Sequence, residues 1–410
     1  ENIAGVDREA FDGCVNIESI STVAEFVGTF PKNSLKYATV TNGELKDENT
    51  FAGADKLIKA DLKGVTFIAE GTFERCASLT QISLDCNALN FSLGKLFGKA
   101  EYDNSYAAEQ GGEIYYLPVN LNKITVTGGV ISDNSFENMK ELGSVTLSDV
   151  KSIGNRAFAG CAALTAIVIP STVRSIGDGA FENCSFTETV IPFEVREMGV
   201  GAFTNNAGSA LFVEGSFNQV WVNWYDGNGR VIWNYGGERG ETAEGFEWAA
   251  LRDGAAAVYG YNGSRNEINV PEFINGRKVN VIAENGFYGL NAISKIEIGL
   301  HVTEIQAGAF KSCECVVYAF AASKPSGWKA NWNPDNLTVI WNYSGRRGVN
   351  DGYDWAALND NTSAILKYYG KPDNGILEID KAGGLPVSKI MRSAFEGLEN
   401  VNAIFLAESI

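Results

Sequence analysis

Long hydrophobic runs, histidine and proline are what this sequence has least of. No stretch of the 410 residues approaches 18 consecutive apolar residues, so nothing in it is long enough to cross a bilayer as a helix. His301 is the only histidine, so a catalytic or metal-binding histidine would have to be this residue. Proline is scarce at 9 residues and glycine is abundant at 45, a balance that favours many tight turns.

Basic residues are also in short supply. The chain has 33 Lys and Arg against 50 Asp and Glu, which gives a formal net charge of −17 and a pI near 4.7. Such a chain repels phosphate groups, so we expect no nucleic-acid partner and no anionic membrane surface. An apolar content of 45% with 20% charged residues indicates a substantial core and excludes a disordered acidic tail.

A segment of about 22 residues, here called a rung, recurs along the chain. SIGNRAFAGCAALTAIVIP at Ser152–Pro170 returns as SIGDGAFENCSFTETVIP at Ser175–Pro192, and looser copies occur on both sides. Every copy carries Phe at the same anchoring position. These residues are Phe11, Phe51, Phe73, Phe136, Phe158, Phe181, Phe203, Phe287, Phe310 and Phe395. Adjoining anchors lie 22 or 23 residues apart, which is the signature of a stacked solenoid.

Each rung contains the pattern L-x-x-I-x-I, as in Leu164, Ile167 and Ile169. The alternation at its end predicts a strand with one buried face, and a single rung cannot bury that face alone. No ten-residue stretch shows a helical apolar stripe. The predicted fold class is therefore a repeat solenoid: a β-rich, right-handed stack with a parallel sheet, short turns and 3-10 turns.

The motif I-G-x-x-A-F-x-x-C-x-x-L-x-x-I-x-I-P, most complete at Ile153–Pro170, resembles the leucine-rich repeats of BspA-like (Treponema-type) bacterial surface proteins. The resemblance covers most of the chain. It implies a place on the cell surface or outside the cell, and adhesion or protein binding rather than catalysis. The implied partner is a host or bacterial surface protein.

The array is interrupted, which suggests three domains. Residues 1–206 form the repeat array, with long-rung insertions near 21–45 and 86–124. Residues 207–314 hold an aromatic joining unit followed by repeats, and 315–410 hold a second, truncated copy of it. VIWNY at 231–235 recurs 108 residues later, and each copy continues into a hairpin-like segment with a turn at Asp253-Gly254 or Asp360-Asn361.

Both ends of the sequence fall inside a rung, and Glu1 is not preceded by a basic and apolar leader. We therefore expect this chain to be a fragment of a longer surface protein, without its export signal and its anchor. A monomer is expected.

Most residues that could take part in catalysis or metal binding are predicted to have structural roles. Five of the seven cysteines follow the repeat Phe by three residues, at a position that Met139, Leu290 or Ala54 fills in other rungs. Such a position predicts core packing rather than disulfides or metal ligands. His301 aligns with a turn residue and has no nucleophile motif near it. We expect no catalytic residue, no metal site and no cofactor.

Short oxygen-rich or glycine-rich turns do not change this expectation. Asp226-Gly-Asn-Gly lacks the closing carboxylate of a calcium loop. GGERG at 236–240 lacks the Lys-Ser/Thr of a phosphate-binding loop. Both are predicted to be plain turns.

Two groups of residues remain as ligand-binding candidates. The first contains outward-facing positions of the predicted sheet: Asp61, Ser83, Thr146, Val168 and Glu297, with Phe405 in the last rung. Most are small or polar, which favours broad protein contact over a deep pocket. The second contains Trp221, Trp224, Trp328 and Trp332 of the joining units, which could stack on a glycan or pack internally. A carbohydrate-binding module and a structural stalk without a ligand are therefore the alternatives.

Overall fold

The computed structural model describes residues 5–89, 91–206, 209–216 and 221–407. The chain divides into two compact units, Glu1–Gly229 and Arg230–Ile410. The division predicted from the sequence instead starts its second domain at residue 207, which lies outside the described residues.

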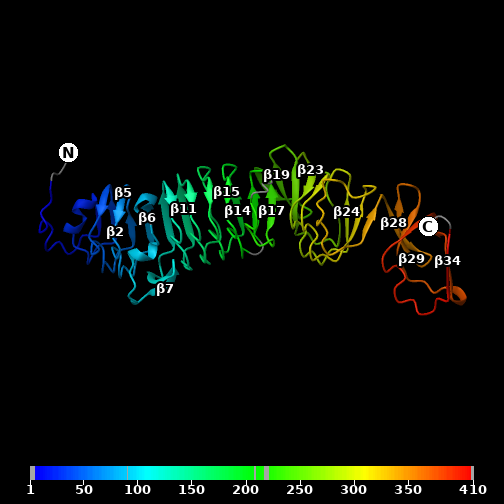
Figure 1. Cartoon of the computed structure of the whole chain (residues 1–410), viewed down its shortest axis with the longest axis horizontal. Helices are drawn as coiled ribbons and strands as arrows, with labels where there is room; N and C mark the ends of the chain where they lie inside the picture. Colours follow the sequence, from blue (N-terminus) through cyan, green and yellow to red (C-terminus); the bar gives the residue numbers. More distant parts are fainter. Residues whose placement is uncertain (1–4, 90, 207–208, 217–220, 408–410) are drawn as a thin grey trace. The chain divides into compact units, whose positions relative to one another are not determined.

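Parallel strands of successive rungs form the main sheet of the first unit (Figure 1). Its six strands are β1 Ser19–Thr22, β2 Tyr37–Val40, β4 Lys59–Asp61, β6 Gln81–Asp85, β9 Lys123–Thr127 and β11 Ser144–Ser148. Side chains alternate along each strand, so Ile82 and Leu84 are buried while Ser83 between them faces outward. The predicted parallel stack is confirmed.

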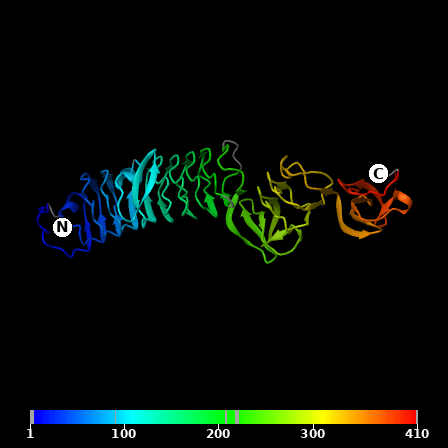
Figure 2. The same cartoon turned by 90° about the horizontal axis from the view of Figure 1, so that it is seen from below.

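A second, much narrower sheet begins in the rungs of β9 and β11 and continues into the rungs that follow. Its strands have two residues each: β10 Val130–Ile131, β12 Ser152–Ile153, β13 Ser175–Ile176 and β15 Glu197–Met198. Two further parallel pairs complete the stack, β3 Gly43–Leu45 with β5 Val65–Ile68 and β14 Glu188–Ile191 with β16 Ala210–Val213. The rungs appear as successive loops in Figure 2.

The rung that matches the repeat motif best departs from it in one respect. Leu164, Ile167 and Ile169 are buried as predicted, but the segment around them forms no regular strand. The following rung has one residue fewer between its Phe and its Pro. The buried positions are thus kept in this rung although its segment is in no ladder.

The insertion near 86–124 folds into short 3-10 turns and a hairpin that projects from the stack (Figure 1). Its elements are η2 Cys86–Ala88, η3 Leu93–Leu96 and the antiparallel strands β7 Ser105–Gln110 and β8 Glu113–Pro118. The buried Gln110 side chain holds the hairpin in place. Its Oε1 accepts from the Gly94 amide at 2.8 Å, and its Nε2 donates to the Glu137 carbonyl at 2.9 Å. The earlier insertion contains η1 Ala24–Thr29.

The second unit repeats one strand order twice. The first copy has β18 Tyr235–Glu241, β19 Phe246–Leu251, β20 Ala256–Tyr261, β23 Arg277–Ile282 and β22 Phe273–Ile274. The second has β28 Tyr343–Asn350, β29 Tyr353–Leu358, β30 Ser363–Tyr368, β33 Leu385–Ile390 and β32 Lys381–Ala382. Both predicted hairpins are confirmed, with positive φ at Gly254 and Asn361 in their turns.

Parallel strands accompany each copy. One sheet contains β21 Glu267–Asn269, β24 Lys295–Ile298, β26 Val316–Ala319 and β27 Val339–Trp341. The other pairs β31 Ile376–Ile379 with β34 Ala403–Leu406. The remaining elements are β17 Arg230–Trp233, β25 Glu304–Ile305 and η4 Asp373–Gly375. Among the described residues no helix exceeds six residues, and none is long and apolar enough to cross a bilayer.

Candidate functional site

The anchoring phenylalanines form columns inside both units. Ring centroids of neighbouring rungs are 5.2 Å apart for Phe51 and Phe73, and 5.0 Å apart for Phe136 and Phe158. In the second unit Phe287 and Phe310 are 5.4 Å apart. Phe11 and Phe395 are only partly buried, and the other eight are buried. These rings fill the core of the stack and are not available to a ligand.

The repeat cysteines hold neighbouring rungs together through hydrogen bonds. All seven cysteines are free. The Sγ of Cys76, Cys161 and Cys184 each donates to the carbonyl of the Phe in the preceding rung at 3.2 Å, and Cys313 does the same at 2.7 Å. Burial raises the pKa of Cys76 to about 12, so its thiol stays protonated and is a poor nucleophile or metal ligand.

Core packing was predicted for all five cysteines at this repeat position, and this is wrong for Cys14, which is exposed. Four of the five are buried. The physical difference is that residues 12–16 around Cys14 are all exposed, so the described residues place no packed rung over this position.

His301 is half-buried and isolated from catalytic partners. No described side chain accepts from or donates to its Nε2, and burial lowers the pKa of the imidazole. A histidine acting as a general base needs a nucleophile within hydrogen-bond reach, and the described residues place none there. Asp226 accepts from the amides of Asn228 and Asn205, so it shapes a turn. The described residues hold no group of three or more His, Cys, Asp or Glu that could bind a metal.

The four candidate tryptophans are all buried. Their exposed fractions lie between 2% and 9%. Trp221 Nε1 donates to the Arg196 carbonyl and Trp328 Nε1 to the Val302 carbonyl, both at 3.2 Å. Trp224 packs edge-on against Phe203, and Trp332 packs in the same way against Phe310. The two pairs therefore continue the phenylalanine columns, and their rings do not face a ligand.

Three of the sheet candidates lie in one row of the first unit. Strand register pairs Asp61 with Ser83 and joins Thr146 to Ser83 through Thr125. The same row continues through Thr39 to Ser21 at the other end. The outward row is thus Ser21, Thr39, Asp61, Ser83, Thr125 and Thr146, six short polar side chains on six adjacent strands.

Ser21 and Thr39 were missed because their segment was assigned to the first insertion, and Thr125 because it directly follows the second. The signal was present in the sequence. KYATVT at 36–41 and KITVT at 123–127 are echoes of each other, and both carry the alternation of a half-buried strand.

The other sheet candidates do not join this row. Val168 is 81% exposed but belongs to the segment without a ladder. Glu297 lies in the second unit and forms an ion pair with Lys295 at 2.5 Å. Its register partner Tyr318 is buried in a cluster with residues of β27, β28, β29 and β30. The outward face of this sheet is therefore covered by the second joining unit. Phe405 is exposed on β34.

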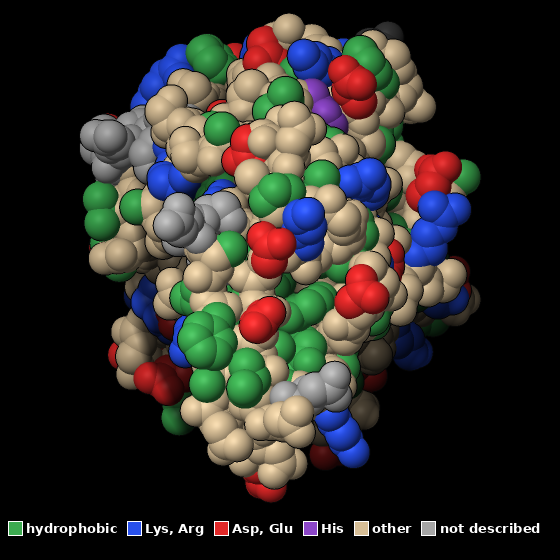
Figure 3. Space-filling view, turned by 90° about the vertical axis from the view of Figure 1, so that its right-hand side faces the viewer, with side chains coloured by type: hydrophobic (Ala, Val, Ile, Leu, Met, Phe, Trp, Pro, Cys, Tyr) green, Lys and Arg blue, Asp and Glu red, His purple; other side chains and the backbone are tan. Residues whose placement is uncertain are grey.

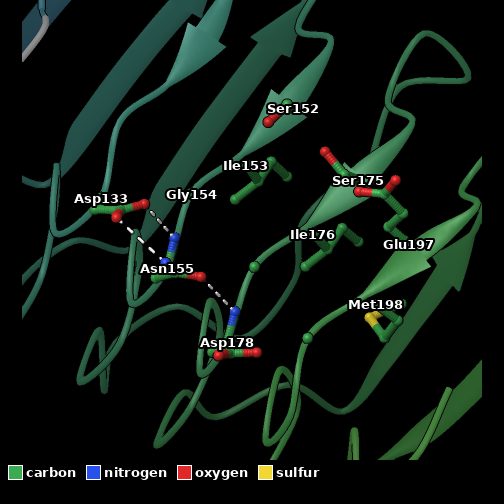
Figure 4. A pocket seen from close by; sticks show the side chains of 12 residues that line it. Asp133, Ser152, Ile153, Gly154, Asn155, Ser175, Ile176, Asp178, Glu197 and Met198 are labelled. Atoms are coloured by element: carbon green, nitrogen blue, oxygen red, sulfur yellow. Dashed lines mark hydrogen bonds between the residues drawn. The ribbon is translucent and has the colours of Figure 1, made fainter.

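A trough of about 370 Å³ crosses the narrow sheet of the first unit (Figure 4). Gly154, Gly177 and Gly199 form its floor, because a Cβ at any of them would come within 2.2–2.6 Å of the preceding rung. A chain of hydrogen bonds forms one wall. Asp133 accepts from the Asn155 amide, Asn155 from the Asp178 amide, and Asp178 from the Val200 amide, at 2.7–2.8 Å. These groups stack the rungs, which accounts for the trough.

Comparison with known proteins agrees with this architecture. The family described as BspA type leucine rich repeat region matches residues 1–94, 116–219 and 261–324, in six copies. No curated protein matches the chain.

Two solved structures match most of the chain at low identity. One is a leucine rich cell surface protein from Faecalibacterium prausnitzii A2-165, with 15% identity, a TM-score of 0.27 and coverage of 95% of this chain and 83% of that one. The other is a leucine-rich repeat protein from Bacteroides ovatus ATCC 8483, with 18% identity, a TM-score of 0.31 and coverage of 85% and 78%.

Proposed function

Because this chain belongs to the BspA type leucine rich repeat family, we propose that it is a non-catalytic binding protein of the bacterial cell surface. Its partner is a surface protein of a host or of another bacterium. It binds to the outward face of the six-stranded sheet in the first unit. The outward row, aligned strand by strand on that face, is the observation that carries the proposal.

The chemistry of this face suits a protein partner. The outward row offers hydroxyl groups and the carboxylate of Asp61. The next row on the same face places Lys59 and Lys123 on either side of Gln81. Hydroxyl groups, two lysines and one carboxylate, which lies 3.8 Å from Lys63, are thus spread over strands about 4.8 Å apart, which matches the polar and hydrogen-bonding character of protein interfaces.

The two units differ in how open this face is. In the first unit the outward side chains of β6 and β9, such as Ser83 and Thr125, remain partly exposed. In the second unit Tyr318 and Ile340 occupy the matching outward positions and are buried under the joining hairpin. The partner is therefore assigned to the first unit.

Bulky substitutions on the outward row test this assignment. Thr125→Trp and Thr146→Trp should each weaken binding to the partner at least about tenfold, since a large ring prevents close approach of a flat surface. Binding is measured by biosensor against purified host extracellular proteins and bacterial surface proteins. A glycan array is screened in parallel.

Ser171→Trp provides the matched control, because Ser171 is an exposed hydroxyl residue in a turn of the same unit. It should leave binding unchanged. Binding that survives both threonine substitutions, or a glycan bound in preference to every protein, would contradict the proposal.

A further inference from the structure

A pocket of about 390 Å³ lies in the first copy of the joining unit. Phe246 of β19, Tyr261 of β20 and Ile268 of β21 supply its apolar lining. Arg265, in the segment between β20 and β21, and Lys295 of β24 supply its positive charges. The volume is at the lower end of the range for ligand sites and suits a body the size of one sugar or one amino acid.

The apolar lining is fixed before any ligand arrives. The rings of Phe246 and Tyr261 are 4.9 Å apart at 58°, and both residues are buried, as is Ile268. The Tyr261 hydroxyl also accepts from the backbone amide of Arg265 at 3.3 Å, which ties the arginine segment to the pocket. The apolar part of the site is therefore preorganised, whereas the exposed Arg265 side chain loses rotamer freedom on binding.

Four charged residues line the pocket, Glu244, Arg265, Glu267 and Lys295, and of these only Glu267 and Lys295 lie within ion-pair distance of each other. Lys295 lies 3.8 Å from a carboxylate oxygen of Glu267, and Arg347 forms a second ion pair with the same glutamate. Arg265 is different, because no described carboxylate lies within ion-pair distance of its guanidinium. Arg265 is exposed and lines the pocket, so its guanidinium is accessible to a ligand.

The second copy shows that these charges are not needed for folding. It keeps the aromatic pair, with Tyr353 and Tyr368 4.8 Å apart. In the first copy Glu267 of β21 lies opposite Lys295 of β24 in the strand register. The corresponding register pair of the second copy is Ile376 of β31 and Ala403 of β34, which are both uncharged. The segment after Tyr368, residues 369–375, contains no arginine. The packing of the unit is shared, whereas Arg265 and the Glu267–Lys295 pair belong to the first copy, and the corresponding turn of the second copy carries Lys371 instead.

We propose that this pocket binds a carboxylate carried on a small, partly apolar body. The Arg265 guanidinium donates two parallel hydrogen bonds to the carboxylate, the geometry in which arginine excels. The apolar body of the ligand occupies the pocket volume, where it meets only the small part of Phe246 and Ile268 that lines the pocket. This site is separate from the sheet face of the first unit, so either proposal can fail without the other.

The test uses the full chain and isothermal titration calorimetry with two acids, glucuronate and N-acetylleucine. Their uncharged counterparts, glucuronamide and N-acetylleucinamide, are titrated beside them. At least one acid should bind saturably and its amide should not, and the acid that binds identifies the source of the carboxylate. Arg265→Gln should weaken binding at least about tenfold, and Arg265→Lys should restore only part of it, because lysine lacks the planar fork.

Lys371→Gln is the matched control, because it removes one cation from the corresponding turn of the second copy. It should bind the acid as the unchanged protein does, and all three variants should keep its melting temperature. The proposal is overturned if neither acid binds, if the amide binds as tightly as the acid, or if Arg265→Gln leaves affinity unchanged.

Discussion

The second unit contains the same strand order twice, in residues 230–337 and again in residues 338–410. These two copies differ in how their polar groups are paired. In the first, Glu247 forms an ion pair with Arg230. In the second, Asp354 occupies the place of Glu247 and Thr338 the place of Arg230. One oxygen of Asp354 is buried without a hydrogen-bond partner, and burial raises the pKa of this carboxyl group.

The copies also differ in how deeply their rungs are buried. Phe287 is 1% exposed and packs at a tilt against Phe310, which in turn contacts Trp332 edge-on. Phe395, 108 residues after Phe287, is only partly buried against Tyr368. The two copies thus keep the same spacing of apolar residues in the sequence. The residues packed around each position determine how much it contributes to stability.

Removing the two equivalent phenylalanines should give the largest contrast. Phe287→Ala opens a cavity in a closed column and should lower the free energy of unfolding by about 3–5 kcal/mol. Phe395→Ala should cost well under half of that, because its ring is already partly hydrated. Urea unfolding followed by circular dichroism measures both. Equal losses for the two variants would show that the columns are equivalent after all.

Replacing the carboxylates of Glu247 and Asp354 by amides should change the stability of the fold in opposite directions. Glu247→Gln leaves Arg230 without its partner and should destabilise the fold by about 1 kcal/mol at neutral pH. Asp354→Asn removes a buried charge and should raise the melting temperature.

The pH dependence of the Asp354→Asn gain distinguishes its cause. The folded-state pKa of Asp354 is raised, so the cost of its charge is fully present at neutral pH. That cost fades as pH falls through the folded pKa toward the ordinary value of 3.8. Calorimetry from pH 7 to pH 3 should therefore show the advantage of the variant shrinking. A constant advantage would point to altered packing.

His301, present in the first copy, should produce the smallest effect. Burial lowers its folded pKa below the ordinary value of 6.5, so the neutral ring is favoured in the folded state. Stability should be complete above pH 6.5 and decline as pH falls below it, because the unfolded chain binds the proton more readily. His301→Gln should flatten that decline in thermal scans between pH 7.5 and 5. An unchanged slope would assign the decline to other groups.

The sequence predicted the features that depend on spacing within a rung. The phenylalanine column, the buried cysteines and both hairpins follow from periodicity and turn residues alone. It could not show that Glu297 lies on a covered face, because the cover comes from residues more than 40 positions later. Nor could it decide whether Trp328 was exposed, since packing and binding predict the same recurrence. Nor could the sequence predict the pocket beside Arg265, because the pocket is lined by residues of β19, β20, β21 and β24, which are brought together only by the fold.

The hydrogen-bonded wall of the trough gives the stack a direction. The side chains of Asp133, Asn155 and Asp178 each accept a hydrogen bond from a backbone amide of the next rung. Each of these rungs therefore has one accepting side and one donating side. A layer turned over would set acceptor against acceptor. A rung copied by gene duplication carries both the accepting side chain and the donating amide. It can therefore pair with its neighbours in the same head-to-tail order, and the array can lengthen without a new kind of contact between rungs.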